Sequence, residues 1–150
     1  MLMQMNVAGM ILEDDEQSFF LLLKEIDGAT IVSIQIDQLQ AESIASVMDK
    51  ALARIPDPYD FLSNIMDSFE LRISRVIIKN PRRYTKNADV FLTDGERELR
   101  IDSHAGDAVA SALLMNAPIF VNNDFLGTAH KKELQKWLSK VRPSDFGEVL

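Results

Sequence analysis

A strand pattern passes directly into a helix pattern between residues 98 and 121, and this junction constrains the fold more than any other part of the chain. Apolar and polar residues alternate over residues 98–101, which predicts a strand, and the alanine-rich residues 108–115 predict a helix. The helix should end before Pro118, because a residue that precedes proline avoids helical geometry. Residues 119–121 then suit a short buried strand, so helix and sheet must pack together within one domain.

Two hairpin signals extend this sheet. Residues 2–11, 18–25 and 32–36 each have the pattern of a strand, and Asp27-Gly28 suits the turn between the second and the third. Asp94-Gly95 suits a turn that joins residues 90–92 to residues 99–101, after a strand rich in β-branched residues at 71–80. The order of elements predicts a single α+β domain with a mixed or antiparallel sheet that contains hairpins.

About four helices are expected to pack on that sheet. The first begins after Asp37, whose carboxylate can form a capping box with Gln40, and it runs to about residue 55. Asp57-Pro58 suits the cap and the first residue of a second helix, the third covers residues 108–115, and the last follows Thr128. The apolar residues of the second helix are expected to face inward; they are Phe61, Leu62, Ile65, Met66 and Phe69.

Composition narrows the classes of partner and compartment. The 150-residue chain has a formal charge of -7, which works against broad attraction to nucleic acids or to anionic membranes. No apolar run approaches the length that spans a bilayer, so no membrane partner is expected. The chain has no cysteine, which excludes disulfides and thiolate metal sites and is compatible with the cytoplasm, where we expect the protein.

The junction and the strand after it resemble the signature of the bifunctional nuclease family. The chain reads Ile101-Asp-Ser-His-Ala-Gly-Asp-Ala108 and later Ala117-Pro-Ile-Phe-Val121. The family pattern is roughly Ile-Asp-Ala/Ser-Arg-Pro-Ser-Asp-Ala, then an alanine-rich helix, then Ala-Pro-Ile-Phe/Tyr-Val. The resemblance covers residues 1–126 and leaves residues 127–150 as a C-terminal helix and tail. It implies a nuclease that hydrolyses phosphodiester bonds of DNA or RNA.

The polar centre of the pattern is altered. A glutamate of the family pattern appears as Gln40, a Thr-His pair appears as Pro58-Tyr59, and Arg-Pro-Ser appears as His104-Ala105-Gly106. The apolar frame is kept. Four polar residues of the pattern are also kept, namely Asp60, Asp102, Ser103 and Asp107.

These kept residues are the candidates for catalysis. Asp102 and Asp107 flank a helix start and, with Asp60, could hold Mg²⁺ or Mn²⁺, which favour oxygen ligands and neutralise charge on a phosphate. Ser103 is a further candidate. The alternative is structural, because an aspartate in the first turn of a helix stabilises it by about 0.3–1 kcal/mol without catalytic duty. Ser103 would then serve as a helix cap.

A local basic segment is the candidate contact for DNA or RNA. Residues 71–86 carry six basic residues and no acidic one, in a chain that is otherwise acidic. The loop after Pro81 is the best candidate for substrate binding, because cations grip phosphates and an aromatic ring can stack on an unpaired base. Its candidate residues are Arg82, Arg83, Tyr84 and Lys86. The alternative is a solvated strand and loop that offset local acidity.

Two functions therefore compete. The first is a nuclease that follows the family. The second is a non-catalytic binding or assembly domain that keeps the fold and has lost the site. A homodimer is expected in the second case. The apolar run Phe19–Leu23 would make both faces of a strand apolar, so each face must pack against another element, and a second copy of the chain could supply one of them.

Overall fold

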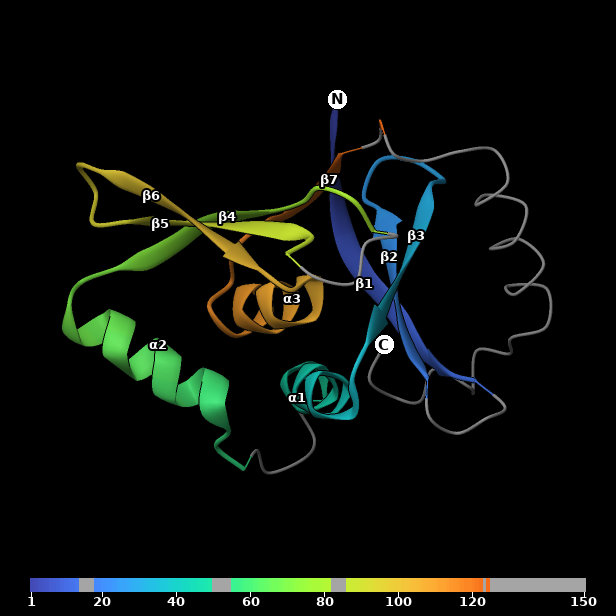
Figure 1. Cartoon of the computed structure of the whole chain (residues 1–150), viewed down its shortest axis with the longest axis horizontal. Helices are drawn as coiled ribbons and strands as arrows, with labels where there is room; N and C mark the ends of the chain where they lie inside the picture. The colour runs from blue at the N-terminus through green and yellow to red at the C-terminus, as the bar shows by residue number, and fades with distance from the viewer. Residues whose placement is uncertain (14–17, 50–54, 82–85, 123, 125–150) are drawn as a thin grey trace.

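The computed structural model describes residues 1–13, 18–49, 55–81, 86–122 and 124, and these form an α+β domain (Figure 1). They hold seven strands in one mixed sheet and three helices, while the fourth expected helix falls in a part of the chain that is not described. The elements are β1 (Leu2–Leu12), β2 (Phe19–Glu25), β3 (Ile31–Ile36), α1 (Gln38–Met48), α2 (Pro58–Ser68), β4 (Arg72–Ile78), β5 (Ala88–Thr93), β6 (Glu98–Ser103), α3 (Ala105–Leu114) and β7 (Ile119–Asn122).

The sheet has the order β3-β2-β1-β7-β4-β5-β6. Both predicted hairpins are confirmed, since β2 pairs antiparallel with β3 and β5 pairs antiparallel with β6. The junction forms β6, α3 and β7: the chain leaves the sheet at its end strand, crosses one face as α3, and returns to the middle of the sheet. There β7 runs parallel to β4 and antiparallel to β1, which makes the sheet mixed.

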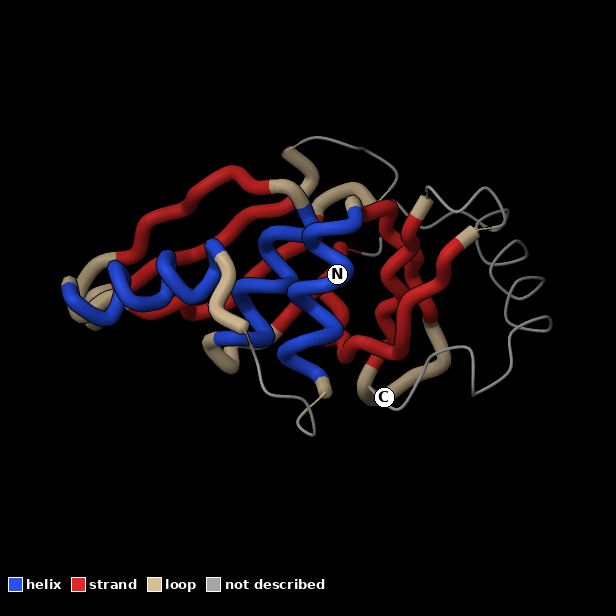
Figure 2. Tube along the Cα trace, turned by 90° about the horizontal axis from the view of Figure 1, so that it is seen from below, coloured by secondary structure: helices blue, strands red, loops and turns tan. Residues whose placement is uncertain are grey.

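The core lies between the sheet and its helices, which all cover the same face (Figure 2). Alanine-rich α3 packs most deeply, because its small side chains let it approach α1 and the strands closely; Val109 and Ala112 are fully buried. Both predicted caps are present, with Asp37 forming a capping box to Gln40 and Asp57 one to Asp60. Among the helices that are described, none has both the length and the hydropathy needed to cross a membrane.

The strand β2 is buried on both faces within one chain. Leu21, Leu22 and Leu23 follow one another, so they alternate between the two faces, and all three are buried. The strand is therefore covered on both sides without a second copy. The sequence argument for a homodimer from this strand is removed, although the oligomeric state itself is not tested by it.

The prediction for the apolar face of α2 is wrong for four of its five residues. Met66 is buried as expected, but Phe61 is 69% exposed, Phe69 is 72% exposed, and Leu62 and Ile65 are also exposed. The reason is the position of α2 beyond α3, toward the end of the sheet (Figure 1). Only the side with Tyr59 and Met66 reaches neighbouring elements.

Candidate functional site

Side chains accept hydrogen bonds from the free backbone N–H groups in the first turn of α3. His104 is the N-cap, and its Nδ1 accepts from the N–H of Gly106 at 3.1 Å. Asn87, which is 1% exposed, accepts from the N–H of Ala105 at 2.6 Å. The prediction that Ser103 caps this helix is wrong, because its hydroxyl donates to the carbonyl oxygen of His104 at 2.9 Å. The N-cap is therefore His104, one residue after Ser103.

Asp107 lies in this first turn and is held by two neutral donors. The Gln40 amide donates to Asp107 Oδ1 at 3.0 Å, and the Tyr59 hydroxyl donates to the same oxygen at 2.5 Å. Gln40 is itself fixed, because its Oε1 accepts from the N–H of Asp37 in the capping box of α1. Asp107 Oδ2 accepts no side-chain hydrogen bond from the described residues, which leaves it free to accept one from a ligand or from water.

Tyr59 acts as a hydrogen-bond donor over the whole physiological range. Its burial, and next its hydrogen bond to Asp107, raise the pKa of the Tyr59 hydroxyl far above its usual value. The negative charges of Asp107, Asp37 and Asp57 act in the same direction. The hydroxyl therefore stays protonated, and it fixes which oxygen of Asp107 is occupied.

The altered positions of the family pattern meet at Asp107. Gln40, Tyr59 and His104 come from α1, α2 and the start of α3, and the Gln40 amide lies 3.1 Å from His104 Nδ1 as well as close to Asp107. A Cβ at Gly106 would lie 2.3 Å from Gln40 Oε1, so the absence of a side chain there makes room for Gln40. The departures from the pattern are thus one coupled group.

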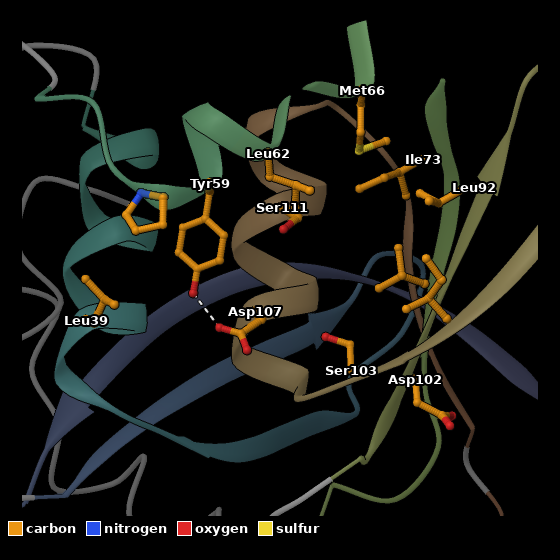
Figure 3. A pocket seen from close by; sticks show the side chains of 13 residues that line it. Leu39, Tyr59, Leu62, Met66, Ile73, Leu92, Asp102, Ser103, Asp107 and Ser111 are labelled. Carbon is orange, nitrogen blue, oxygen red and sulfur yellow. Dashed lines mark hydrogen bonds between the residues drawn. The ribbon is translucent and has the colours of Figure 1, made fainter. Parts of the chain in front are cut away.

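A cavity of about 470 Å³ opens beside Asp107 (Figure 3). Ser103 and Asp107 lie together at one end, Asp102 contributes to the wall there while its side chain points away from Asp107, and Ser111 lies one helical turn beyond Asp107 on α3. The rest of the wall is mainly apolar. It consists of Leu39, Pro58, Tyr59, Leu62, Met66, Ile73, Val90, Leu92 and Ile101.

A cluster of alternating charges surrounds the Asp102 carboxylate on the opposite face of the sheet, because Asp89 and Asp102 alternate with the cavity residues Val90 and Ile101 along their strands. Lys79 Nζ lies 3.1 Å from Asp89 and 3.4 Å from Asp102, and Arg100 lies 2.8 Å from Asp89 and 3.1 Å from Asp102. The hydrogen bond from Lys79 lowers the pKa of the Asp102 carboxyl, and the charges of Lys79 and Arg100 add to this. Asp89 and Asp102 face each other across β5 and β6, which explains why two cations gather there.

The three predicted carboxylates are not equivalent. Asp102 and Asp107 both line the cavity, whereas Asp60 is absent from its wall and closes the capping box of α2 by accepting from the N–H of Asp57 at 2.7 Å. Within the described ranges, no group of three or more His, Asp or Glu side chains is placed to hold a metal ion. The residues around Asp107 do not supply a resident metal site by themselves.

The basic segment is partly neutralised. Arg75 pairs with Glu98 at 2.8 Å and stacks over the ring of Phe91, and Lys79 belongs to the charge cluster. Lys86 is exposed and forms no ion pair with a described residue. Three further candidates lie outside the described residues, namely Arg82, Arg83 and Tyr84. Lys86 adjoins Asn87, whose side chain binds the N–H of Ala105 at the start of α3.

Sequence reasoning missed several of these contacts. It did not single out Asn87 or Arg100, and it counted Lys79 in the basic segment without its pairing to Asp102. It treated Gln40 and Tyr59 as losses rather than as partners of Asp107. Asn87 gives no sequence signal. Lys79 and Arg100 could have been found from the hairpin register, because that register places Asp89 opposite Asp102.

Two comparisons with known proteins show what the chain is similar to. The family model of the bifunctional nuclease domain matches residues 21–133. Two uncharacterized proteins of Mycobacterium tuberculosis, from strains CDC 1551 / Oshkosh and ATCC 25618 / H37Rv, are each 25% identical to the chain over 162 aligned residues. Each match covers 95% of this chain and 97% of the relative.

Proposed function

Because this chain belongs to the bifunctional nuclease family, we propose that it hydrolyses phosphodiester bonds of DNA or RNA at the polar end of the cavity. The observation that carries the proposal is Asp107, a carboxylate in the cavity wall with one oxygen fully occupied and the other available. Such an arrangement orients a carboxylate for proton transfer, because its rotation is blocked by the donors on Oδ1.

Asp107 is assigned the role of positioning the attacking water. Its Oδ2 accepts the proton as the water oxygen bonds to phosphorus, the ester P–O bond breaks, and the departing oxygen takes a proton from solvent. Gln40 and Tyr59 are positioning residues in this scheme, since they contact Asp107 and not the substrate. Ser103 lies at the same end of the cavity, and its hydroxyl is assigned a turn away from the carbonyl oxygen of His104 to donate a hydrogen bond to a phosphate oxygen.

One cation near the start of α3 is assigned to the phosphate. Exposed Lys86 precedes Asn87, whose side chain binds the first turn of α3, whereas Lys79 and Arg100 are paired with Asp102 on the opposite face of the sheet. A phosphate at the polar end of the cavity meets the N-terminal end of α3, which favours an anion, with Lys86 nearby. Arg82 and Arg83 extend the basic segment in the sequence and are kept as proposed substrate contacts, with Tyr84 as a stacking residue.

Dependence on Mg²⁺ or Mn²⁺ stays a prediction. The donor set around Asp107 lacks the ligands of a resident site, but Mg²⁺ is often bound by one or two carboxylates together with waters and substrate phosphates. A metal would then bind with the substrate and not to the protein alone. The steps assigned above to the residues of this chain do not require it.

The test is cleavage of end-labelled single-stranded DNA and RNA by purified protein at low salt, with Mg²⁺, Mn²⁺ or EDTA. The Asp107→Asn variant keeps the size of the side chain and removes the proton acceptor, so a loss of at least about 100-fold in rate is expected. Asp67→Asn is the matched control, because Asp67 is an exposed aspartate on α2, remote in sequence from the signature.

Rapid cleavage at the same rate by Asp107→Asn and Asp67→Asn would contradict the role of Asp107. Only low cleavage, at the same rate in the wild type and Asp107→Asn, would indicate a contaminating nuclease. In that second case the alternative function gains support.

The alternative is a non-catalytic binding or assembly domain that acts as a homodimer. Exposed apolar side chains favour it: Phe61 on α2 and its C-cap Phe69 are exposed, as are Leu99 and Ile101 on β6, a strand that pairs on one side only with the described strands. Antiparallel pairing of β6 with a second copy, centred on Ile101, would place Arg100 opposite Asp102 of the partner subunit.

Sedimentation equilibrium tests this alternative. A wild-type dimer that becomes a monomer in the double variant Phe61→Ser/Phe69→Ser supports assembly through this surface. A wild-type monomer at micromolar concentration contradicts it.

A further inference from the structure

The two ends of the cavity differ in chemistry, and the proposed hydrolysis uses only one of them. Ser103 and Asp107 lie at the polar end, whereas Met66, Ile73 and Leu92 form the opposite end (Figure 3). The total volume of about 470 Å³ falls within the range of about 300–1,000 Å³ that is usual for small-molecule sites. The apolar end would strongly disfavour a phosphate, because it offers no partner that offsets the cost of removing water from the phosphodiester charge.

Ser111 places a hydroxyl in the wall of this cavity, one helical turn beyond Asp107. Its side chain is 5% exposed, and it makes no hydrogen bond with any residue that the structure describes. Among the described residues its hydroxyl is not one of the buried polar atoms that lack a partner, so it opens to the cavity, where it can bond to water or to a ligand. Ser111 lies four residues after Asp107, on the same face of α3, so it points to a polar atom of a ligand that also reaches toward Asp107.

We propose that the apolar end is a nucleobase pocket, which receives one unstacked base of the substrate strand. This inference rests on the proposed function and names its substrate class, a nucleic acid with an unpaired base. A base has apolar faces and a polar edge, which match apolar walls with a single hydroxyl. The phosphate next to that base then lies at the polar end.

The proposal is tested by binding, separately from cleavage. Fluorescence anisotropy is measured in EDTA with a labelled 12-nucleotide single strand, with the same strand made wholly abasic, and with a duplex of the same sequence. The abasic strand keeps the phosphates and loses the bases. The ordinary strand is expected to bind about 10-fold more tightly than the abasic strand and than the duplex, in which the bases are paired.

Two serine variants locate the effect. Ser111→Ala is expected to weaken the ordinary strand by about 5-fold and to leave the abasic strand unchanged, because only a base contacts the hydroxyl. Ser43→Ala is the matched control, since Ser43 is a buried serine on α1 that does not line the cavity. Alanine is a good helix former, so both variants should fold.

Equal affinity for the ordinary and the abasic strands would overturn the nucleobase pocket. It would also be overturned if Ser111→Ala weakened binding of the ordinary and the abasic strands equally. The same holds if Ser43→Ala weakened binding of the ordinary strand as much as Ser111→Ala does. These outcomes are distinguishable from failure of the proposed hydrolysis, because an inactive protein can still discriminate bases and an active one can bind through phosphates alone.

Discussion

At the scale of single residues, Asp107 is defined by its neighbours. A glutamate at position 40 would bring a second negative charge toward this carboxylate, whereas Gln40 donates a hydrogen bond to it. The sequence shows each altered position, but it cannot show that positions 40, 59 and 104–107 touch, because they belong to three different helices. Their convergence depends on the tertiary fold.

The coupling between Gln40 and Gly106 is expected to appear in a double-mutant cycle. Gly106→Ala should destabilise the protein by about 1–3 kcal/mol, because the new Cβ displaces the fixed Gln40 side chain. In the background of Gln40→Ala the same change should be neutral or stabilising by up to about 1 kcal/mol, because alanine is the better helix former. Urea unfolding measures all four proteins. Additive effects would contradict the coupling.

The bond between Tyr59 and Asp107 predicts a pH dependence of stability. The pKa of Tyr59 is higher in the folded protein than in the unfolded chain, where it is about 10. Its contribution to the free energy of unfolding is therefore fully present below pH 10 and is lost as the pH rises above that value. Above pH 10, the unfolding free energy should fall by about 1.4 kcal/mol per pH unit from this group. Tyr59→Phe lacks this dependence.

The comparison of the two proteins isolates the effect. At pH 7, Tyr59→Phe should be less stable by about 1–3 kcal/mol, because Asp107 loses a donor to a charged group. In chemical unfolding experiments, the free energies of unfolding of the wild type and Tyr59→Phe should converge as the pH rises above 10. A constant difference across this range would show that Tyr59 titrates normally in the folded protein.

At the scale of elements, local signals predicted the starts of α1 and α2 and both hairpins, but not the start of α3. Asp37 and Asp57 cap α1 and α2 because short carboxylate side chains satisfy free N–H groups without help from the rest of the fold. The covered face of α2 was not predictable in this way. Periodicity shows which residues share a face, but the extent of cover depends on where the helix lies against the sheet.

The position of α2 predicts unequal effects of substitutions on one helix. Met66→Ala should destabilise the protein by about 2–5 kcal/mol, because Met66 is buried in the core. Phe61→Ser should change the free energy of unfolding by less than about 1 kcal/mol, since Phe61 is mostly exposed. Thermal and urea unfolding compare them. A large cost for Phe61→Ser in a monomeric protein would contradict the exposed position.

At the scale of the whole molecule, a strongly acidic chain must contact nucleic acid through a small surface. The basic segment looked uniform in the sequence, yet Arg75 and Lys79 are paired with acidic residues from neighbouring strands. The family signature predicted the fold correctly, because its apolar frame is the β6-α3-β7 unit. Chemistry could not be predicted equally well, since it depends on pairing across strands.

This limited surface predicts a weak dependence of binding on salt. Two to three phosphate contacts correspond to a slope of about -1.4 to -2.1 for log K against log salt with single strands, at about -0.7 per contact. Anisotropy titrations between 50 and 200 mM salt, chosen as roughly physiological limits, measure the slope. A slope steeper than about -5 would require a broad basic face.

The most direct test of a nucleic-acid site at Asp107 is its location on the protein. Amide chemical shifts are followed by NMR while a single-stranded hexanucleotide is added to the isotope-labelled protein in EDTA. The largest changes are expected at Ser103, Asp107 and Ser111, with smaller changes at Tyr59. Changes confined to the exposed face of α2, or no changes at the start of α3, would contradict the site.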